Sequence, residues 1–172
     1  MDHFARLGLP AALELEPAAL DRAYFALQRQ WHPDRFVARP PEERARASVE
    51  AAALNDAYRT LKDPLSRAVY LASLEGVDLP GDGKTIDDPE LLMEAMEQRE
   101  ALHEASSAEA VDALAAQARD DRREALAALG GLFLAGDKPA IRKALLRLRY
   151  LDKFVEEAGA RRANIERSRR TV

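Results

Sequence analysis

The chain of 172 residues contains no cysteine. This absence excludes a disulfide framework, a thiolate metal site and a cysteine nucleophile, and it fits a reducing compartment. Valine and isoleucine are also scarce, because together they number ten against 34 alanines and 24 leucines. Alanine and leucine favour helices, whereas valine and isoleucine favour strands. The composition therefore predicts a helical protein without a large sheet.

Long apolar runs are missing as well. The longest stretch without a charged residue covers residues 125–136 and contains three glycines. A membrane-spanning helix needs about 20 apolar residues, so this stretch is too short to cross a bilayer. The first six residues lack the basic start and the apolar run of a signal peptide. We therefore expect a soluble, cytoplasmic protein with no membrane partner.

The net charge is small, at −4 from 26 basic and 30 acidic residues, and the total does not indicate a nucleic-acid binder. Its distribution is uneven. Residues 1–75 carry ten basic and eleven acidic side chains, and residues 87–112 carry nine acidic and one basic. Residues 138–172 carry eleven basic and four acidic side chains. The second half of the chain is therefore polarised between an acidic and a basic segment.

Three glycines and a proline fall within residues 76–83 and mark a domain boundary. We predict a first domain at 1–75, a linker at 76–88 and a second domain at 89–172. Apolar spacing, prolines and capping residues predict four helices before the linker and three after it. The expected helices cover 2–7, 17–31, 42–62, 64–75, 89–105, 106 to at least 129, and 137 to about 158, with an extension beyond 158 left open. The fold class is all-α, with an antiparallel helical hairpin and short helices followed by a three-helix bundle.

Two details of the second domain concern helix ends. Ser106-x-x-Glu109 has the pattern of a capping box at the start of the middle helix. The sequence leaves open whether Gly130-Gly131 interrupts that helix.

The tripeptide His32-Pro33-Asp34 lies in the loop between the two long helices of the first domain. Pro33 stiffens the turn, so its neighbours lose little entropy on binding a partner. Asp34 is an acceptor suited to an arginine of that partner. The alternative is purely structural, with Pro33 ending a helix and Asp34 capping a turn. Basic residues surround the tripeptide and would steer it toward an acidic surface, namely Arg22, Arg29 and Arg35.

Further patterns accompany the tripeptide, namely Asn55-x-Ala57-Tyr58 and Asp63-Pro64. Together they resemble the J-domain of co-chaperones that activate DnaK-class ATPase chaperones. The resemblance covers about residues 1–75 and implies that the tripeptide and the nearby arginines bind such a chaperone. The basic stripe is thinner than in many J-domains, since Phe25 and Ala26 lie between Arg22 and Arg29.

Patterns at both ends of the first domain, and others within the second domain, indicate a more specific family. The quoted patterns are Asp2-x-Phe4-x-x-x-Gly8-Leu9-Pro10, Arg67-x-x-Tyr70, Leu91-Leu92-Met93-Glu94, Glu97-x-Arg99-Glu100 and Leu148-Arg149-Tyr150-Leu151-Asp152-Lys153. They resemble the HscB family, the dedicated co-chaperones of iron–sulfur cluster assembly. The resemblance implies two partners, an HscA-type chaperone for the first domain and the scaffold protein IscU for the second. It implies no cofactor and no metal. The scaffold-binding positions that it implies are Leu92, Met93, Met96, Glu97, Glu100, Glu104 and Tyr150.

Helical spacing supports a shared surface for part of this set. Residues 92, 96, 100 and 104 are separated by four and lie on one helix face. An apolar centre with an acidic rim would form a small interface. The alternative places Leu92, Met93 and Met96 in the core, as is usual for apolar residues at helical spacing. Leu91, Ala95 and Leu102 form a separate stripe that could serve the core instead.

The basic final helix allows two interpretations. It could lie against the acidic helix and pair charges within the bundle. Alternatively, Arg161-Arg162 and Arg167-x-Arg169-Arg170 could lead a nucleic-acid patch, although no interleaved aromatic residues accompany them. We favour the first and expect no nucleic-acid partner.

No pattern indicates an enzyme. The three histidines are far apart in the sequence, and no glycine-rich phosphate loop is present. We expect no catalytic residues. The other function that stays open is a general J-domain co-chaperone with a different client.

Overall fold

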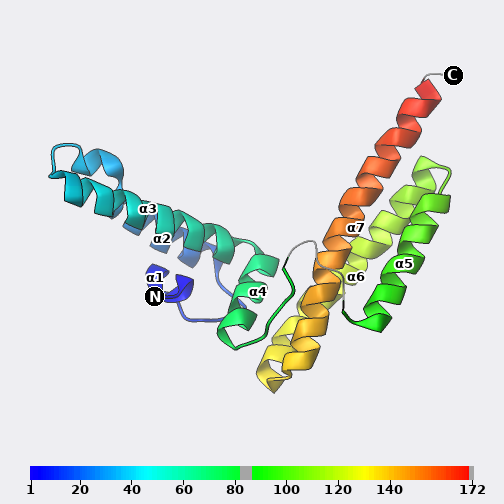
Figure 1. Ribbon diagram of the computed structural model, residues 1–172, viewed down its shortest axis with the longest axis horizontal. Helices are drawn as coiled ribbons and strands as arrows, with labels where there is room; N and C mark the ends of the chain where they lie inside the picture. The colour runs from blue at the N-terminus through cyan, green and yellow to red at the C-terminus, as the bar shows by residue number, and fades with distance from the viewer. Residues whose placement is uncertain (82–86, 171–172) are drawn as a thin grey trace. The chain divides into compact units, whose positions relative to one another are not determined.

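The computed structural model of the protein describes residues 1–81 and 87–170, which form seven α-helices and one short 3₁₀ helix, with no strand among these residues (Figure 1). The predicted all-α class is confirmed. The helices fall into two compact units, Met1–Glu75 and Gly76–Val172. Residues 82–86 of the predicted linker, and residues 171–172 of the predicted second domain, lie outside the described residues. No helix within the described ranges has the length and hydropathy needed to cross a membrane.

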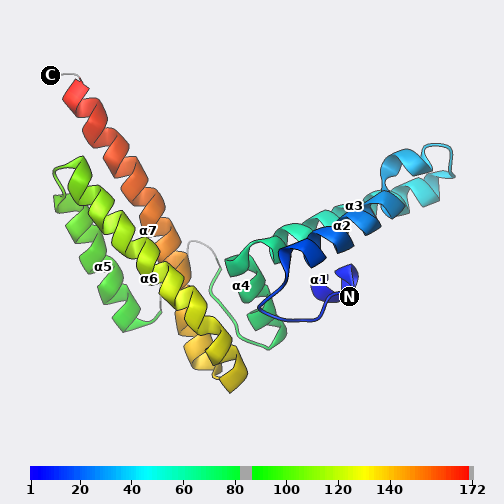
Figure 2. The ribbon, with the colours of Figure 1, turned by 180° about the vertical axis from the view of Figure 1, so that it is seen from behind.

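The first unit is built around two long helices. Its elements are α1 (His3–Leu7), α2 (Pro17–Trp31), the 3₁₀ helix η1 (Pro33–Phe36), α3 (Pro41–Lys62) and α4 (Pro64–Leu74). The phenol oxygen of Tyr58 on α3 donates to Asp21 near the start of α2, and Tyr24 one turn later donates to Asn55. Because later residues of α2 meet earlier residues of α3, the two helices are antiparallel, as predicted (Figures 1 and 2).

Proline and aspartate set the helix boundaries of this unit. Pro17, Pro41 and Pro64 each occupy the first turn of a helix, where the missing backbone N–H costs nothing. The Asp63 side chain accepts a hydrogen bond of 2.7 Å from the backbone nitrogen of Ser66 and so caps α4. Gly8 ends α1 at φ 66°, a left-handed conformation that favours glycine.

The core of the first unit runs along α3, where small and large apolar side chains alternate. The buried residues are Phe4, Leu7, Leu20, Ala47, Ala51, Leu54, Ala57, Leu61, Leu65, Ala68, Leu71 and Ala72. Arg67 fastens the loop before α2 to this core, since its side chain donates to the carbonyl oxygens of Leu13 and Leu61 at 2.6 and 2.7 Å. The hydroxyl of Tyr70 accepts from the backbone nitrogen of His3 at 2.9 Å. Through these hydrogen bonds, the Arg67-x-x-Tyr70 pattern joins α4 to α1 and to the loop before α2.

The second unit is an up-down-up bundle of α5 (Pro89–Glu104), α6 (Ala108–Ala135) and α7 (Lys138–Arg170). Arg162 near the end of α7 pairs with Asp112 near the start of α6, so these two helices are antiparallel. Helices α5 and α7 are parallel, because Lys143 and Arg147 meet Glu90 and Glu94 in the same order. The predicted three-helix bundle is confirmed (Figure 2).

Helix α6 begins one residue later than the capping-box pattern predicts. Ser107, not Ser106, is the N-cap, and its hydroxyl accepts a hydrogen bond of 3.1 Å from the backbone nitrogen of Ala110. Both serines are of a type that commonly caps helices. Ala108 and Val111 in the first turn of α6 lie against the core, at 8% and 1% exposed.

Helix α6 also continues through Gly130-Gly131 and ends at Gly136, which has φ 66°. Two glycines inside a helix cost about 1 kcal/mol each relative to alanine. Packing against α7 outweighs that cost, since Leu129 beside the pair is fully buried. Helix α7 runs to Arg170, so the extension beyond Ala158 that the sequence left open is present.

The described part of the predicted linker is packed on the second unit. Val77 is only 6% exposed. Arg142 of α7 donates to the carbonyl oxygen of Asp78 at 3.1 Å, and Arg149 donates to that of Pro80 at 2.9 Å. Arg142 also pairs with Asp87 at 2.6 Å, which lowers the pKa of that carboxyl group. Residues 76–81 therefore lie along α7 and do not form a free connector.

The core of the second unit predicts the effect of truncating its largest buried side chain. Phe154 is 2% exposed and packs against Tyr150, with the ring centroids 6.3 Å apart. Phe154→Ala should lower the free energy of unfolding by about 3–5 kcal/mol, because it removes buried surface and leaves a cavity. Urea unfolding followed by circular dichroism measures this. Leu134→Ala is the control, since Leu134 is 92% exposed. A loss for Phe154→Ala no larger than that of the control would contradict the assignment of this core.

Candidate functional site

The turn after α2 holds the His32-Pro33-Asp34 tripeptide in a compact geometry. His32 leaves the helix at φ −60° and ψ 128°, an extended conformation that proline imposes on the residue before it. The backbone nitrogen of Asp34 donates to Nδ1 of His32 at 3.3 Å, and that of Arg35 donates to the His32 carbonyl oxygen at 3.0 Å. The turn is therefore fixed by its own hydrogen bonds.

The side chains of the tripeptide face solvent. His32 is 53% exposed and Asp34 is 86% exposed, and the atoms Nδ1 and Oδ2 of this pair are 3.6 Å apart. Nδ1 of His32 is thus engaged within the turn. Asp34 therefore offers its carboxylate, and His32 its second ring nitrogen, Nε2, to a binding partner.

Three residues outside the predicted site, Trp31, Phe36 and Arg46, pack against one another beside this turn and form a brace for it. The rings of Trp31 and Phe36, which flank the tripeptide, are stacked with centroids 6.0 Å apart and an interplanar angle of 4°. The guanidinium carbon of Arg46 on α3 lies 5.7 Å from the centroid of Trp31. Arg35 adds a hydrogen bond of 3.0 Å to the carbonyl oxygen of Arg29. Sequence reasoning missed this brace, although the aromatic residues on both sides of the tripeptide were a usable signal.

The predicted arginines of α2 lie on its outer face. Arg22 and Arg29 are both exposed and are two helical turns apart. Arg22 has one ion-pair partner, Glu16, at 3.6 Å, and both side chains are about two-thirds exposed. Surface pairs of this kind contribute little to stability. Arg22 is thus available to exchange Glu16 for an acidic group on a partner.

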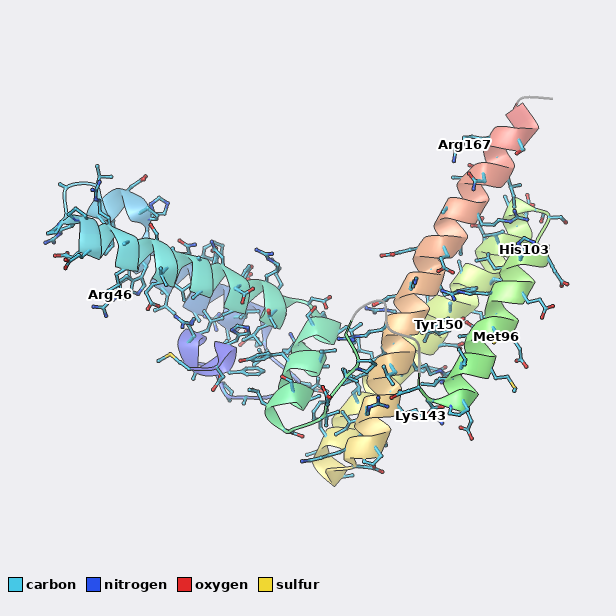
Figure 3. All side chains as sticks on the ribbon, viewed as in Figure 1. Arg46, Met96, His103, Lys143, Tyr150 and Arg167 are labelled. Atoms are coloured by element: carbon cyan, nitrogen blue, oxygen red, sulfur yellow. The ribbon has the colours of Figure 1, made fainter. Side chains whose placement is uncertain are left out.

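The second predicted surface lies on α5, where three apolar side chains point to solvent. Leu92, Met93 and Met96 are 37%, 65% and 64% exposed. Figure 3 shows the Met96 side chain directed away from α7. The inner face of the same helix is occupied by Leu91, Ala95 and Leu102, and all three are buried. The interpretation of Leu92, Met93 and Met96 as core residues is therefore wrong.

Carboxylates divide between the two faces of α5. Glu90 and Glu94 on the inner side pair with Lys143 and Arg147 of α7 at 2.5 and 2.6 Å. On the outer side, the carboxylates of three exposed glutamates have no hydrogen bond or ion pair within residues 1–81 and 87–168; these are Glu97, Glu100 and Glu104. The outer acids are therefore free to meet cationic groups of a partner.

Tyr150 is separated from the rest of its predicted set. It lies on α7 and is 7% exposed. Its hydroxyl donates to Oε1 of Gln98 at 2.8 Å and lies 3.3 Å from the carbonyl oxygen of Ala95. Burial raises the pKa of this phenol to about 12, so the hydroxyl remains a donor at neutral pH. Tyr150 holds α5 on α7 and does not share the exposed surface.

The basic residues of α7 are largely engaged within the bundle. Lys143 and Arg147 pair with glutamates of α5, as described above. One contact has the charges reversed, since Glu157 of α7 accepts two hydrogen bonds from Arg99 of α5. Arg161 donates to the carbonyl oxygens of His103 and Ala105 at the end of α5. Arg162 pairs with Asp112 and Glu166. This arrangement agrees with the predicted charge pairing. The side chains of Arg169 and Arg170 lie outside the described part of the chain.

The molecule thus carries two candidate surfaces, one on each unit. The first joins the His32-Pro33-Asp34 turn with the outer arginines of α2. The second joins three apolar side chains with three acids on α5. Both surfaces are exposed to solvent.

Residues 87–159 match the family described as the HSCB C-terminal oligomerisation domain. The chain is 42% identical over 167 residues to the co-chaperone protein HscB homolog of Burkholderia multivorans, and the match covers 95% of each protein.

Two solved structures have the same fold over almost the whole chain. The chaperone HscB from Vibrio cholerae is 34% identical with a TM-score of 0.81, and the match covers 96% of this chain and 99% of that one. The human co-chaperone protein HscB is 29% identical with a TM-score of 0.84, and the match covers 93% of this chain and 81% of that one. The chain belongs to the HscB family of co-chaperones, which act in iron–sulfur cluster assembly.

Proposed function

We propose that the protein joins two partners, each through one of the described surfaces. The His32-Pro33-Asp34 turn and the outer arginines of α2 bind a DnaK/HscA-class ATPase chaperone and stimulate its hydrolysis of ATP. The outer face of α5 binds an IscU-like scaffold protein and brings it to that chaperone. The protein itself performs no chemical step and holds no cluster.

The observation that carries this proposal is the division of α5 into two faces. Leu92, Met93 and Met96 are exposed although a separate set of apolar residues fills the core. Leaving three large apolar side chains together in water is unfavourable unless a partner covers them. The unpaired acids beside them give this partner a defined character, namely an apolar contact surrounded by basic groups.

The geometry of the tripeptide supports the chaperone half of the proposal. A turn braced by Trp31 and Phe36 presents Asp34 with little freedom left to lose on binding. A carboxylate that meets an arginine in this way forms a charge-assisted and directional contact.

A single assay tests the proposal as a whole. The ATPase rate of an HscA-type chaperone is measured with the scaffold alone, with this protein alone and with both, and a pull-down on apo and cluster-loaded scaffold measures binding separately. The proposal expects stimulation by this protein and a further increase with the scaffold. Stimulation without any binding of the scaffold would point to a different client.

Removing the Asp34 carboxylate should abolish activation but not folding. The side chain is 86% exposed, so Asp34→Ala leaves the core untouched. Loss of one partner of a hydrogen-bonded charge pair costs about 2–5 kcal/mol, so the stimulation should fall by about 30-fold or more. Glu14→Ala, an exposed acid of the same unit, is the matched control. Full stimulation by Asp34→Ala would remove the tripeptide from the mechanism.

Truncating the apolar centre of α5 should weaken binding of the scaffold. Leu92→Ala combined with Met96→Ala removes two exposed anchors, and we expect affinity to fall by about tenfold or more. Stability should stay within about 0.5 kcal/mol, as is usual for surface substitutions. Calorimetry with the scaffold and thermal unfolding measure the two quantities, with Leu134→Ala as the control. A large loss of thermal stability would return these residues to the core.

Tyr150→Phe distinguishes a role of Tyr150 in holding α5 on α7 from a direct contact of its hydroxyl with the scaffold. The variant keeps the ring but loses the hydrogen bonds to Gln98 and Ala95, so it should lower stability by about 1 kcal/mol. Affinity for the scaffold should fall less than in the Leu92/Met96 double variant, because the exposed surface is intact. A loss of affinity equal to that of the double variant, with unchanged stability, would show that the hydroxyl contacts the scaffold directly.

A further inference from the structure

The outer face of α2 carries an aromatic residue between its two arginines. Phe25 is 55% exposed, and Arg22, Ala26 and Arg29 on the same side of the helix are exposed as well. The core side of α2 is defined by Leu20, which is 3% exposed and lies on the opposite side of the helix at 3.6 residues per turn. Phe25 is therefore directed away from the core.

The ring of Phe25 is not left to move freely. It packs against the ring of Tyr24, with centroids 5.2 Å apart and an interplanar angle of 59°. Tyr24 is in turn stacked on Tyr58 of α3 at 4.0 Å and 17°. Three aromatic rings thus form a ladder from α3 to the outer face of α2.

Hydrogen bonds fix two rings of this ladder, those of Tyr24 and Tyr58. The Tyr24 hydroxyl donates to Oδ1 of Asn55 at 2.7 Å, and the Tyr58 hydroxyl donates to Oδ1 of Asp21 at 2.7 Å. Lys62 donates to the Tyr58 hydroxyl at 2.8 Å, with its ammonium group 4.9 Å from the ring centroid. Asn55 and Tyr58 come from the Asn55-x-Ala57-Tyr58 pattern, so this pattern holds the aromatic ladder in place.

We infer that Phe25 is an apolar anchor for the ATPase chaperone, continuous with the His32-Pro33-Asp34 turn, and that Tyr24 and Tyr58 are its positioning residues. The inference rests on the proposed function. Phe25 precedes His32 by seven residues, which is about 10 Å along the axis of α2. The partner surface would carry an apolar depression bordered by carboxylates, which match Phe25 and its two flanking arginines.

Phe25 has the properties of a residue that anchors a binding partner. A rigid aromatic residue buries a large area at low cost in conformational entropy, and binding energy concentrates in such residues when charged groups form the rim. The arginines supply long-range attraction that salt screens, whereas Phe25 supplies contact that salt does not screen. The two contributions can therefore be measured separately.

The test is the stimulation of an HscA-type chaperone as a function of the concentration of this protein, at two salt concentrations. Phe25→Ala should raise the concentration for half-maximal stimulation by about tenfold and leave the maximum unchanged, because Asp34 is intact. The salt dependence should stay that of the wild type. Arg22→Ala with Arg29→Ala should reduce the salt dependence instead. Val49→Ala, which truncates a 66% exposed side chain on α3, should change none of these quantities.

A pair of variants tests the positioning residue Tyr58. Tyr58→Phe keeps the stacked ring and should leave half-maximal stimulation within about twofold of the wild type. Tyr58→Leu removes the stack and should raise that concentration several-fold, and circular dichroism confirms that the helices are retained. Equal behaviour of the two variants would show that the ladder does not act through its rings.

The outcomes separate this inference from the function on which it rests. If the wild-type protein gives no stimulation, the proposed function fails, and if Asp34→Ala keeps full stimulation, the tripeptide is removed from the mechanism and the inference fails with it. If Asp34→Ala abolishes stimulation and Phe25→Ala matches Val49→Ala at every concentration, only the anchor is refuted. If Phe25→Ala instead dissociates a dimer of this protein in sedimentation without changing stimulation, the face joins two copies of the chain and the inference is overturned.

Discussion

The placement of α5 on α7 is the constraint on which the second unit depends. Helix α5 turns its buried stripe, Leu91, Ala95 and Leu102, toward the core. Ion pairs with Lys143, Arg147 and Glu157, together with the buried hydroxyl of Tyr150, add specific contacts between α5 and α7. Because Glu90 and Glu94 are paired in this way, the outer acids and the exposed methionines are the groups of α5 that face solvent.

In the first unit, a different set of contacts holds the exposed candidate surface in place. Its tripeptide is exposed and yet ordered. The order comes from groups behind the turn, namely the Trp31–Phe36 stack and the hydrogen bonds of the turn itself. In both units, the residues of the exposed candidate surface are thus held in place by neighbours that do not belong to that surface.

Much of this architecture follows from local chemistry that a sequence displays. Proline at a first turn and aspartate at a cap have nearly the same effect in any helix, so the boundaries at Pro17, Asp63 and Asp88 were predictable. The choice between Ser106 and Ser107 was not, because serine caps equally well at either position and the pattern does not rank the two. Tyr150 shows the same limit, since helical spacing cannot tell which α7 side chains α5 covers. The Trp31–Phe36 stack crosses a turn, where no helical period relates the two rings, so the one signal for it was the presence of aromatic residues on both sides of the tripeptide.

The stack behind the tripeptide also makes the molecule its own spectroscopic probe. Trp31 is the one tryptophan of the chain, and it lies directly before His32 with Phe36 against its ring and the guanidinium of Arg46 nearby. Indole emission is sensitive to such neighbours, so the intrinsic fluorescence of the whole protein reports on this one turn. Docking of a chaperone could therefore be followed without a label, from the position best placed to sense it.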